Sequence, residues 1–249
     1  ARTLLTRIAK SLACRAPVMF RVASATCKLV ACTCPASSEL IDAEPADSVA
    51  AMFAEPVSFS AGLMVPPTSY FAAIKQILDE HDISFVVDEV ITGFGRTGSM
   101  FGSVGFELQP DHMTMAKAIT SGYFPLSALA LGRDLYSDLE RGSEAVGTLA
   151  HAATHAAHPV GAAAALKTIE IIERENLVGN AEKVGIYLQS QLEELQSRHP
   201  TVADTRGIGL MHVVELKRNP ETGEEFTDED AVGERMPKLL REEGILARA

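Results

Sequence analysis

The chain of 249 residues lacks cysteine beyond residue 34, because its four cysteines are Cys14, Cys27, Cys32 and Cys34. The remainder therefore needs no disulfide bond and offers no thiolate ligand for a metal. The chain also lacks any apolar run close to the roughly 18 residues that a transmembrane helix requires. With 47% hydrophobic and 22% charged residues, its composition is that of an ordinary globular protein, for which we expect a cytoplasmic location and no membrane partner.

An excess of positive charge is missing as well, since the net charge is −11 at pH 7. A phosphate backbone is bound by excess Lys and Arg, so this balance argues against a nucleic-acid partner. The charge is unevenly spread. Residues 1–38 hold six basic residues and no acidic residue, whereas residues 39–249 hold 16 basic and all 33 acidic residues, a net charge of −17.

This basic start sets residues 1–45 apart, and it has three interpretations. An Arg-rich, acid-poor composition is typical of a targeting segment. Cys32 and Cys34 could bind a metal, although their C-x-C spacing lacks a second pair of ligands. We favour the third interpretation, in which residues 1–45 are foreign to the fold.

Further along, short apolar runs alternate with one amphipathic segment. Buried strands are expected at residues 50–57, 83–87, 112–115 and 128–131, and a helix capped by Thr68 is expected at residues 69–81. Strands and helices in alternation are typical of an α/β fold with a mainly parallel sheet.

From Val160 onward the pattern changes to long amphipathic helices. Helices are expected at residues 161–175, 181–197 and about 230–243, strands at residues 202–206 and 209–216, and a further strand starting at Ile245. We therefore divide the chain into a larger domain at residues 46–165 and part of a smaller α+β domain at residues 166–249.

Two charged residues stand where expected strands end. Asp88 follows the run ISFVV and opens a loop rich in glycine, and Lys117 follows a second short strand among small and apolar residues. A carboxylate that stabilises a cation and an amine that can form a Schiff base are what a protein supplies to pyridoxal phosphate. The two residues together therefore indicate pyridoxal phosphate (PLP) as the cofactor.

The order of the surrounding motifs points to a family. They are EPV, FVVDEVITGFGRTG, PDHMTMAKAITSGYFPLSAL, THAAHPVGAAAAL and RGIGLMHVVEL, in that order along the chain. This series resembles the class III (omega-type) PLP-dependent aminotransferases from about residue 46 onward. The resemblance implies the PLP-dependent transferase fold type I, with part of its large domain and part of its small domain.

The resemblance also implies roles for single residues. Asp88 matches the carboxylate that pairs with the pyridine nitrogen, Val90 the residue that packs on the cofactor ring, and Lys117 the Schiff-base lysine. Thr154 matches the threonine that binds the cofactor phosphate of the opposite subunit, which implies a homodimer with composite active sites. The chain departs from the family just after Thr154, where residues 155–157 are His-Ala-Ala in place of an aromatic residue and glycine.

Other polar residues near these motifs have less specific interpretations. We expect Glu89 to hydrogen-bond behind the site, Glu55 to orient the pocket wall, and Arg96 to serve in a structural ion pair rather than as a substrate clamp. The spacing of His151, His155 and His158 could suggest a metal, but the family uses none there, and we assign no metal.

Two features of the family are not recognisable in this sequence. Residues 1–45 contain neither its phosphate-binding G-S-x-A loop nor its ring-stacking aromatic residue, and the last segment of the family has no counterpart. The letters of residues 142–145 fit that loop, but they follow Lys117 and we do not assign them. We therefore expect a chain that is incomplete at both ends.

The resemblance implies that an amino group is transferred from an amine or ω-amino acid to a keto acid such as pyruvate. Two alternatives stay open at this point. Another PLP reaction on the same fold, such as an aminomutase, would need no second substrate. A catalytically incompetent fragment of an aminotransferase would carry these motifs without the activity.

Overall fold

The computed structural model describes residues 41, 44, 48–59, 61–149 and 153–247. Cys32, Cys34 and His151 therefore lie outside the described residues, together with nearly all of the segment 1–45.

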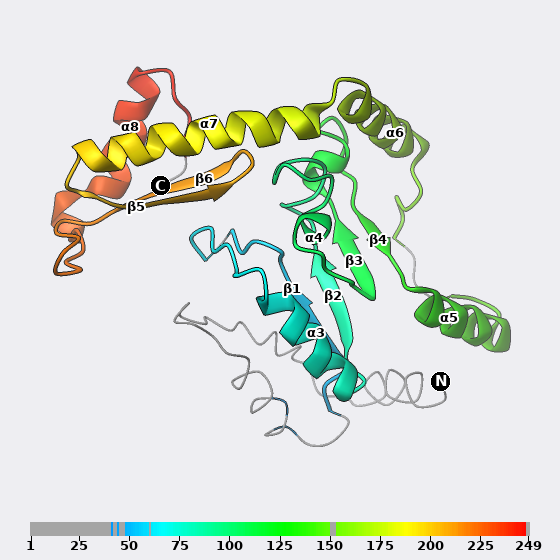
Figure 1. Ribbon diagram of the computed structural model, residues 1–249. Helices are drawn as coiled ribbons and strands as arrows, with labels where there is room; N and C mark the ends of the chain where they lie inside the picture. Colours follow the sequence, from blue (N-terminus) through cyan, green and yellow to red (C-terminus); the bar gives the residue numbers. More distant parts are fainter. Residues whose placement is uncertain (1–40, 42–43, 45–47, 60, 150–152, 248–249) are drawn as a thin grey trace.

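A four-stranded sheet forms the centre of the larger part of the structure (Figure 1). Its strands are β1 (Ala51–Ala54), β2 (Ser84–Asp88), β3 (His112–Met115) and β4 (Ala128–Ala130), in that order across the sheet. The first three are parallel and β4 is antiparallel to β3. β3 and β4 are joined without a crossover α-helix, and a parallel pair would require one. The mainly parallel sheet is thus confirmed.

Helix α3 (Tyr70–Glu80) covers one face of this sheet, as Figure 1 shows. Its buried residues Phe71, Ile74 and Leu78 pack with Phe85 and Val87 of β2. Ile41, which lies within the segment 1–45, packs against the same cluster. The expected cap at Thr68 is wrong: the helix begins after Ser69, which makes no side-chain capping bond.

The segment between β2 and α6 holds two helices and a 3₁₀ turn. Helix α4 (Gly102–Gly105) closes the glycine loop, and the 3₁₀ turn η1 (Lys117–Ile119) is separated from β3 by one residue, Ala116. Helix α5 (Arg133–Val146) was not expected from the sequence, since its residues are mostly polar and its single buried residue is Asp138. Residues 142–145 lie inside α5, where they form no phosphate loop.

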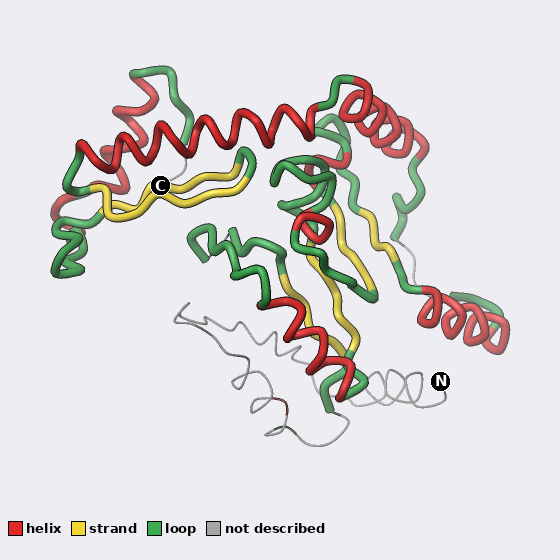
Figure 2. The backbone as a smooth tube through the Cα atoms, viewed as in Figure 1, coloured by secondary structure: helices red, strands yellow, loops and turns green. Residues whose placement is uncertain are grey.

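The smaller part begins with two helices, α6 (Pro159–Arg174) and α7 (Leu177–Arg198). Strands β5 (Val202–Ile208) and β6 (Met211–Leu216) form an antiparallel pair, and α7 lies along it (Figure 2). A 3₁₀ turn η2 (Asp228–Asp230) leads into α8 (Val232–Glu242). The strand expected from Ile245 is absent from the described residues 245–247.

The two parts meet where the backbones of three segments approach one another. A Cβ atom added to Gly185 of α7 would lie 2.0 Å from the carbonyl oxygen of Gly209, in the turn between β5 and β6. A Cβ atom added to Gly209 would lie 2.4 Å from the carbonyl oxygen of Arg96 in the glycine loop. The backbone amide of Leu210 donates to that same oxygen at 2.9 Å. This three-backbone junction therefore joins the small part to the loop that follows Asp88.

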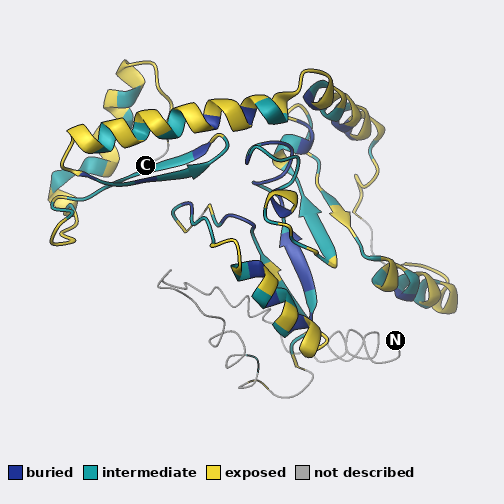
Figure 3. Cartoon of the chain, in the orientation of Figure 1, coloured by how far each residue is buried: buried dark blue, intermediate teal, exposed yellow. Residues whose placement is uncertain are grey.

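The burial pattern separates the sheet from the helices at the periphery. In Figure 3 the middle of β2 is buried, whereas α7 and α8 are exposed along most of their length. Within the part of the chain that the structure describes, no helix has the length and apolarity to cross a membrane. The expected cytoplasmic location stays a prediction.

Candidate active site

Three neighbouring strands place polar residues at one edge of the sheet. Ala54 of β1 is in register with Val87 of β2, so Glu55 follows at the level of Asp88. Asp88 is in turn in register with Thr114 of β3. Because paired residues of parallel strands direct their side chains to the same face, Glu55, Asp88 and Thr114 share one face at the carboxyl ends of the strands. Ligands of open α/β sheets bind at this kind of edge.

Asp88 is the last residue of β2, whereas the sequence analysis placed it just past the strand. Its Oδ1 atom accepts a hydrogen bond from the backbone amide of Val90 at 2.9 Å. Among the described residues, no hydrogen bond engages its Oδ2 atom. The carboxylate is therefore fixed by one oxygen and open to a ligand at the other.

Lys117 begins the 3₁₀ turn two residues after β3 ends. Its backbone has a φ of 47°, in the left-handed region that residues other than glycine rarely adopt. This conformation turns the chain sharply at the carboxyl end of the sheet. The lysine predicted from the sequence therefore stands near the strand ends that carry Asp88.

Glu89 lies behind the site, as expected, and is completely buried. Its Oε2 atom accepts from the backbone amide of Gly102 at 2.9 Å and from the Thr92 hydroxyl, and its Oε1 atom accepts from the backbone amide of Ser103 at 2.6 Å. These three bonds fold the glycine loop back onto the residue next to Asp88. A buried carboxylate with several donors rigidifies its surroundings.

The charge of Glu55 is coupled to the other two groups of the edge. Burial raises the pKa of this carboxyl above its ordinary value, and a hydrogen bond from the backbone amide of Phe59 lowers it. The negative charge of Asp88 raises the pKa of Glu55 further, and the positive charge of Lys117 lowers it. Glu55 therefore lies within range of the charges of both Asp88 and Lys117.

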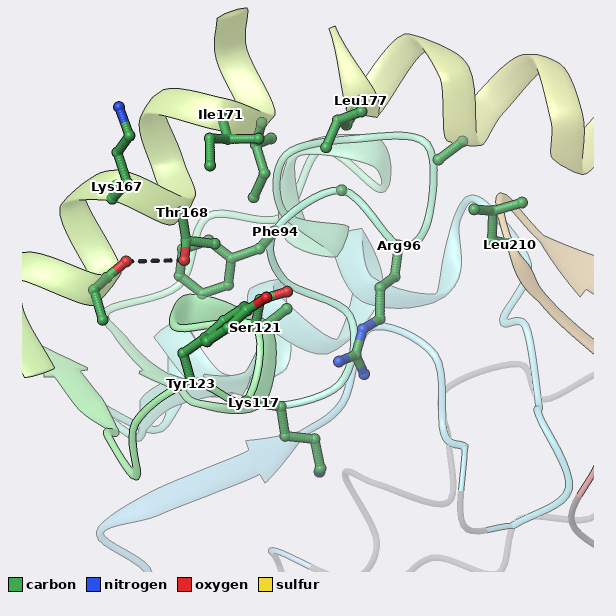
Figure 4. A pocket seen from close by; sticks show the side chains of 16 residues that line it. Phe94, Arg96, Lys117, Ser121, Tyr123, Lys167, Thr168, Ile171, Leu177 and Leu210 are labelled. Carbon is green, nitrogen blue, oxygen red and sulfur yellow. Dashed lines mark hydrogen bonds between the residues drawn. The ribbon is translucent and has the colours of Figure 1, made fainter. Parts of the chain in front are cut away.

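Lys117 also lines a pocket of about 1100 Å³ between the glycine loop, the turn after β3, and helices α6 and α7. Figure 4 shows that Arg96 and Lys117 extend in the same direction from the loops that carry them. The full lining is Phe94, Gly95, Arg96, Lys117, Ala118, Ser121, Gly122, Tyr123, Ala164, Lys167, Thr168, Ile171, Ile172, Leu177, Ala181 and Leu210. Asp88 and Val90 are not part of this lining. Lys117 is therefore the residue that belongs both to the pocket and to the polar residues at the carboxyl ends of the strands.

The structure does not bring every predicted residue to this place. Thr154 is exposed in the loop before α6, and no hydrogen bond among the described residues links it to Asp88 or Lys117. The ring of His158 stacks on Phe124 with centroids 4.9 Å apart, and its Nδ1 atom accepts from the backbone amide of Val160. His158 therefore caps α6. No group of three potential metal ligands is found among the residues that the structure describes.

Two features of the site were missed by the sequence analysis. The Thr114 hydroxyl is buried without a hydrogen-bond partner among the described residues, although the register with Asp88 directs it to the same face. Arg96 makes no ion pair among these residues, contrary to our expectation. The alternation in HMTM could have indicated the position of Thr114, but no local signal indicates that Arg96 is unpaired.

The residues present fit the two reactive ends of pyridoxal phosphate. An oxygen of Asp88 without a hydrogen bond suits a ring nitrogen, and the Lys117 amine suits an aldehyde. The unpartnered hydroxyl of Thr114 beside them supports this fit, because polar atoms buried without partners mark places where a ligand or water belongs.

Comparison with known proteins identifies relatives over most of the chain. The family model described as aminotransferase class-III matches residues 15–249. This match starts inside the segment 1–45, whose separation from the fold stays a prediction. An uncharacterised aminotransferase of Sinorhizobium fredii is 46% identical over 211 residues, covering 85% of this chain and 45% of the relative. A putrescine–pyruvate aminotransferase of Pseudomonas aeruginosa is 39% identical over 82% of this chain and 43% of the relative.

Solved structures show the same relationship in three dimensions. The omega transaminase from Pseudomonas jessenii in complex with PMP has a TM-score of 0.82 and 37% identity, covering 86% of this chain and 47% of that one. A transaminase obtained by ancestral reconstruction has a TM-score of 0.81 and 43% identity, covering 86% of this chain and 47% of that one. The α/β fold expected from the sequence is thereby confirmed. The chain spans about half the length of the relatives it matches.

Proposed function

Because the chain belongs to the class III aminotransferase family, we propose that the protein it represents transfers an amino group from an amine or ω-amino acid to a keto acid such as pyruvate. The observation that carries the proposal is the position of Asp88 and Lys117 at the carboxyl ends of the neighbouring strands β2 and β3, where the charges of both act on Glu55. Relatives named for putrescine with pyruvate and for diaminobutyrate with 2-oxoglutarate support this substrate class.

The residues of the chain would divide the work as follows. When bound, pyridoxal phosphate supplies an aldehyde for the amino group and a ring that stores the electrons released at the substrate carbon. The Asp88 carboxylate would pair with the ring nitrogen and keep it protonated, since an opposite charge nearby favours the charged form. Val90, whose amide fixes the Asp88 carboxylate, would pack against the ring.

Lys117 would act as base and acid. Its Nζ atom would take the proton from the substrate carbon that bears the amino group. In the second half of the reaction it would deliver a proton to the keto-acid carbon that receives the amino group. Glu89 would keep the loop after Asp88 in place through its three hydrogen bonds. None of these roles requires a metal.

The proposal includes a homodimer. Thr154 is exposed and apart from Lys117 in this chain, which suits a residue that serves the site of an opposite subunit. In such a dimer each active site would be composite, with Thr154 donating its hydroxyl to a phosphate oxygen of the cofactor bound by the partner subunit.

Covalent capture of the cofactor tests the proposal directly. The purified chain is incubated with pyridoxal phosphate, reduced with borohydride and digested, and the labelled peptide is identified by mass spectrometry. We expect the label on Lys117, its loss in Lys117→Ala, and its retention in Lys167→Ala, which removes a second lysine of the same pocket.

Two results would count against the proposal. Equal labelling of several lysines would show that the cofactor reacts without a site. Capture at Lys117 combined with turnover of a single amino compound, without any keto acid, would identify an aminomutase instead.

A further inference from the structure

The pocket beside Lys117 carries positive charge in a chain that is negative as a whole. Its lining contains Arg96, Lys117 and Lys167 and no Asp or Glu, whereas the net charge of the chain is −11. Lys167 is paired with Glu170 on the exposed side of α6. The remaining two cations, Arg96 and Lys117, have no ion pair within the described part of the chain. The pocket therefore favours an anionic ligand near these two residues.

Of these two cations, Arg96 shows the effect of burial without a partner more clearly. Burial lowers the pKa of its guanidinium, and its side chain has no hydrogen bond to any described residue. Arg206 shows the contrast, since its guanidinium binds the carbonyl oxygen of Gly62 and the carboxylates of Asp204 and Glu215. A partly buried charge without a partner costs free energy, and an anion at Arg96 would remove that cost.

The backbone that carries Arg96 is held in place before any ligand arrives. The carbonyl oxygen of Arg96 accepts from the amide of Leu210 at 2.9 Å. On either side of it, added Cβ atoms at Gly95 and Gly98 would lie 3.2 Å from Val178 and Glu182 of α7. Because the loop is already fixed, binding an anion would cost little backbone entropy, and the main ordering cost would be that of the Arg96 side chain.

The direction of the Arg96 side chain indicates which class of anion would fit the pocket. Arg96 and Lys117 line one pocket and extend the same way (Figure 4). A 2-oxo acid carries its reactive carbonyl carbon next to its carboxylate, so an acid held at Arg96 keeps that carbon in the pocket of Lys117. A guanidinium also matches the planar geometry of a carboxylate, with two parallel hydrogen bonds.

We propose that Arg96 binds the carboxylate of the 2-oxo acid acceptor and holds its carbonyl carbon toward Lys117. The assignment of this acid as an acceptor rests on the proposed function, whereas the anion site itself does not. Arg96 would thereby distinguish an acceptor that carries a carboxylate from an uncharged ketone or aldehyde.

Binding without cofactor tests the site independently of the reaction. The affinity of the chain for pyruvate and for its uncharged methyl ester is measured by ligand-observed NMR in low salt. We expect Arg96→Gln to weaken pyruvate binding by about tenfold, the loss of one charge-assisted contact, and to leave the ester unchanged. Arg96→Lys should fall between Arg96→Gln and wild type, because it keeps the charge but loses the paired geometry.

Controls separate the local effect from a general one. Arg174→Gln removes an ion-paired arginine of α6 and should leave pyruvate binding unchanged, with folding of each variant checked by thermal melting. The proposal is overturned if the wild-type chain does not bind pyruvate, or if Arg96→Gln binds pyruvate as tightly as wild type does. It is also overturned if Arg96→Gln weakens the binding of inorganic phosphate more than it weakens the binding of pyruvate. Pyruvate binding through Arg96 without covalent capture at Lys117 would refute the proposed function and leave the anion site standing.

Discussion

At the scale of single residues, the edge of the candidate active site brings carboxylates, an amine and a hydroxyl to the ends of three strands. The charges of Asp88 and Lys117 act on Glu55, and burial raises the pKa of the Glu55 carboxyl above its ordinary value. Its environment therefore offers a test of how strongly this edge is shielded from water.

The raised pKa of Glu55 predicts a pH dependence of stability. The folded state holds the proton of Glu55 more tightly than the unfolded state, so its contribution to stability is fully present below the ordinary pKa near 4.5. This contribution is lost as the pH rises through the raised pKa. Relative to Glu55→Gln, which carries no charge, wild type should lose stability as the pH increases from about 4.5 upward.

Urea unfolding at a series of pH values between about 4 and 7 measures this difference. Glu144→Gln, at an exposed position of α5, serves as the control and should run parallel to wild type. If the free energy of unfolding changes with pH in the same way for wild type and Glu55→Gln, the prediction is contradicted and the Glu55 carboxyl is exposed to water.

The candidate site residues could be proposed from the sequence where their signals are local. Asp88 and Lys117 follow apolar runs directly, and the buried position of Glu89 follows from its place next to Asp88. The unpaired state of Arg96 and the orphan hydroxyl of Thr114 depend on register and on distant segments. Such properties are set by tertiary packing, which a single sequence does not display.

At the scale of elements, the three-backbone junction fixes how α7 and the β5–β6 turn meet the glycine loop. The neighbours of Gly185 and Gly209 are backbone atoms rather than flexible side chains. Backbone atoms cannot swing aside, so an added methyl group must move a whole segment.

Substitution of Gly185 by alanine should therefore destabilise the chain by about 1–3 kcal/mol, the usual cost of overpacking. Gly233 of α8 is the matched control, because an added Cβ meets nothing within 4 Å. There alanine should be neutral or stabilise by up to about 1 kcal/mol through its higher helix propensity. Urea midpoints of both variants measure the effect, and equal shifts would show that the junction is loose.

The helices α6, α7 and α8 were predicted from the sequence, whereas α5 was not. The strand at residues 112–115 and the helices α6 and α7 follow from apolar patterns. Helix α5 was not predicted because its sequence, RDLYSDLERGSEAV, is mostly polar. The strand expected at Ile245 is apolar in sequence, but within the described residues no neighbouring strand offers it hydrogen bonds.

At the scale of the whole molecule, the division of the chain into segments stays a prediction. The family match starts at residue 15, and Ile41 packs against the cluster under α3. Both observations bear on where a boundary near residue 45 should lie.

Two truncations locate this boundary. A chain of residues 39–249 should melt at the temperature of the whole chain if the basic start is foreign to the fold. A chain of residues 46–249 should melt lower, because it loses the contacts of Ile41, and Ile41→Ala should reproduce a loss of about 1 kcal/mol. Differential scanning calorimetry compares the four proteins. A lower melting temperature for residues 39–249 would make the basic start part of the fold.

The left-handed backbone of Lys117 has a consequence for how this position evolves. A lysine at a φ of 47° is strained by about 1 kcal/mol relative to glycine, the residue that folding alone would select there. A lineage released from catalysis should therefore drift toward glycine at this position and gain stability as it does.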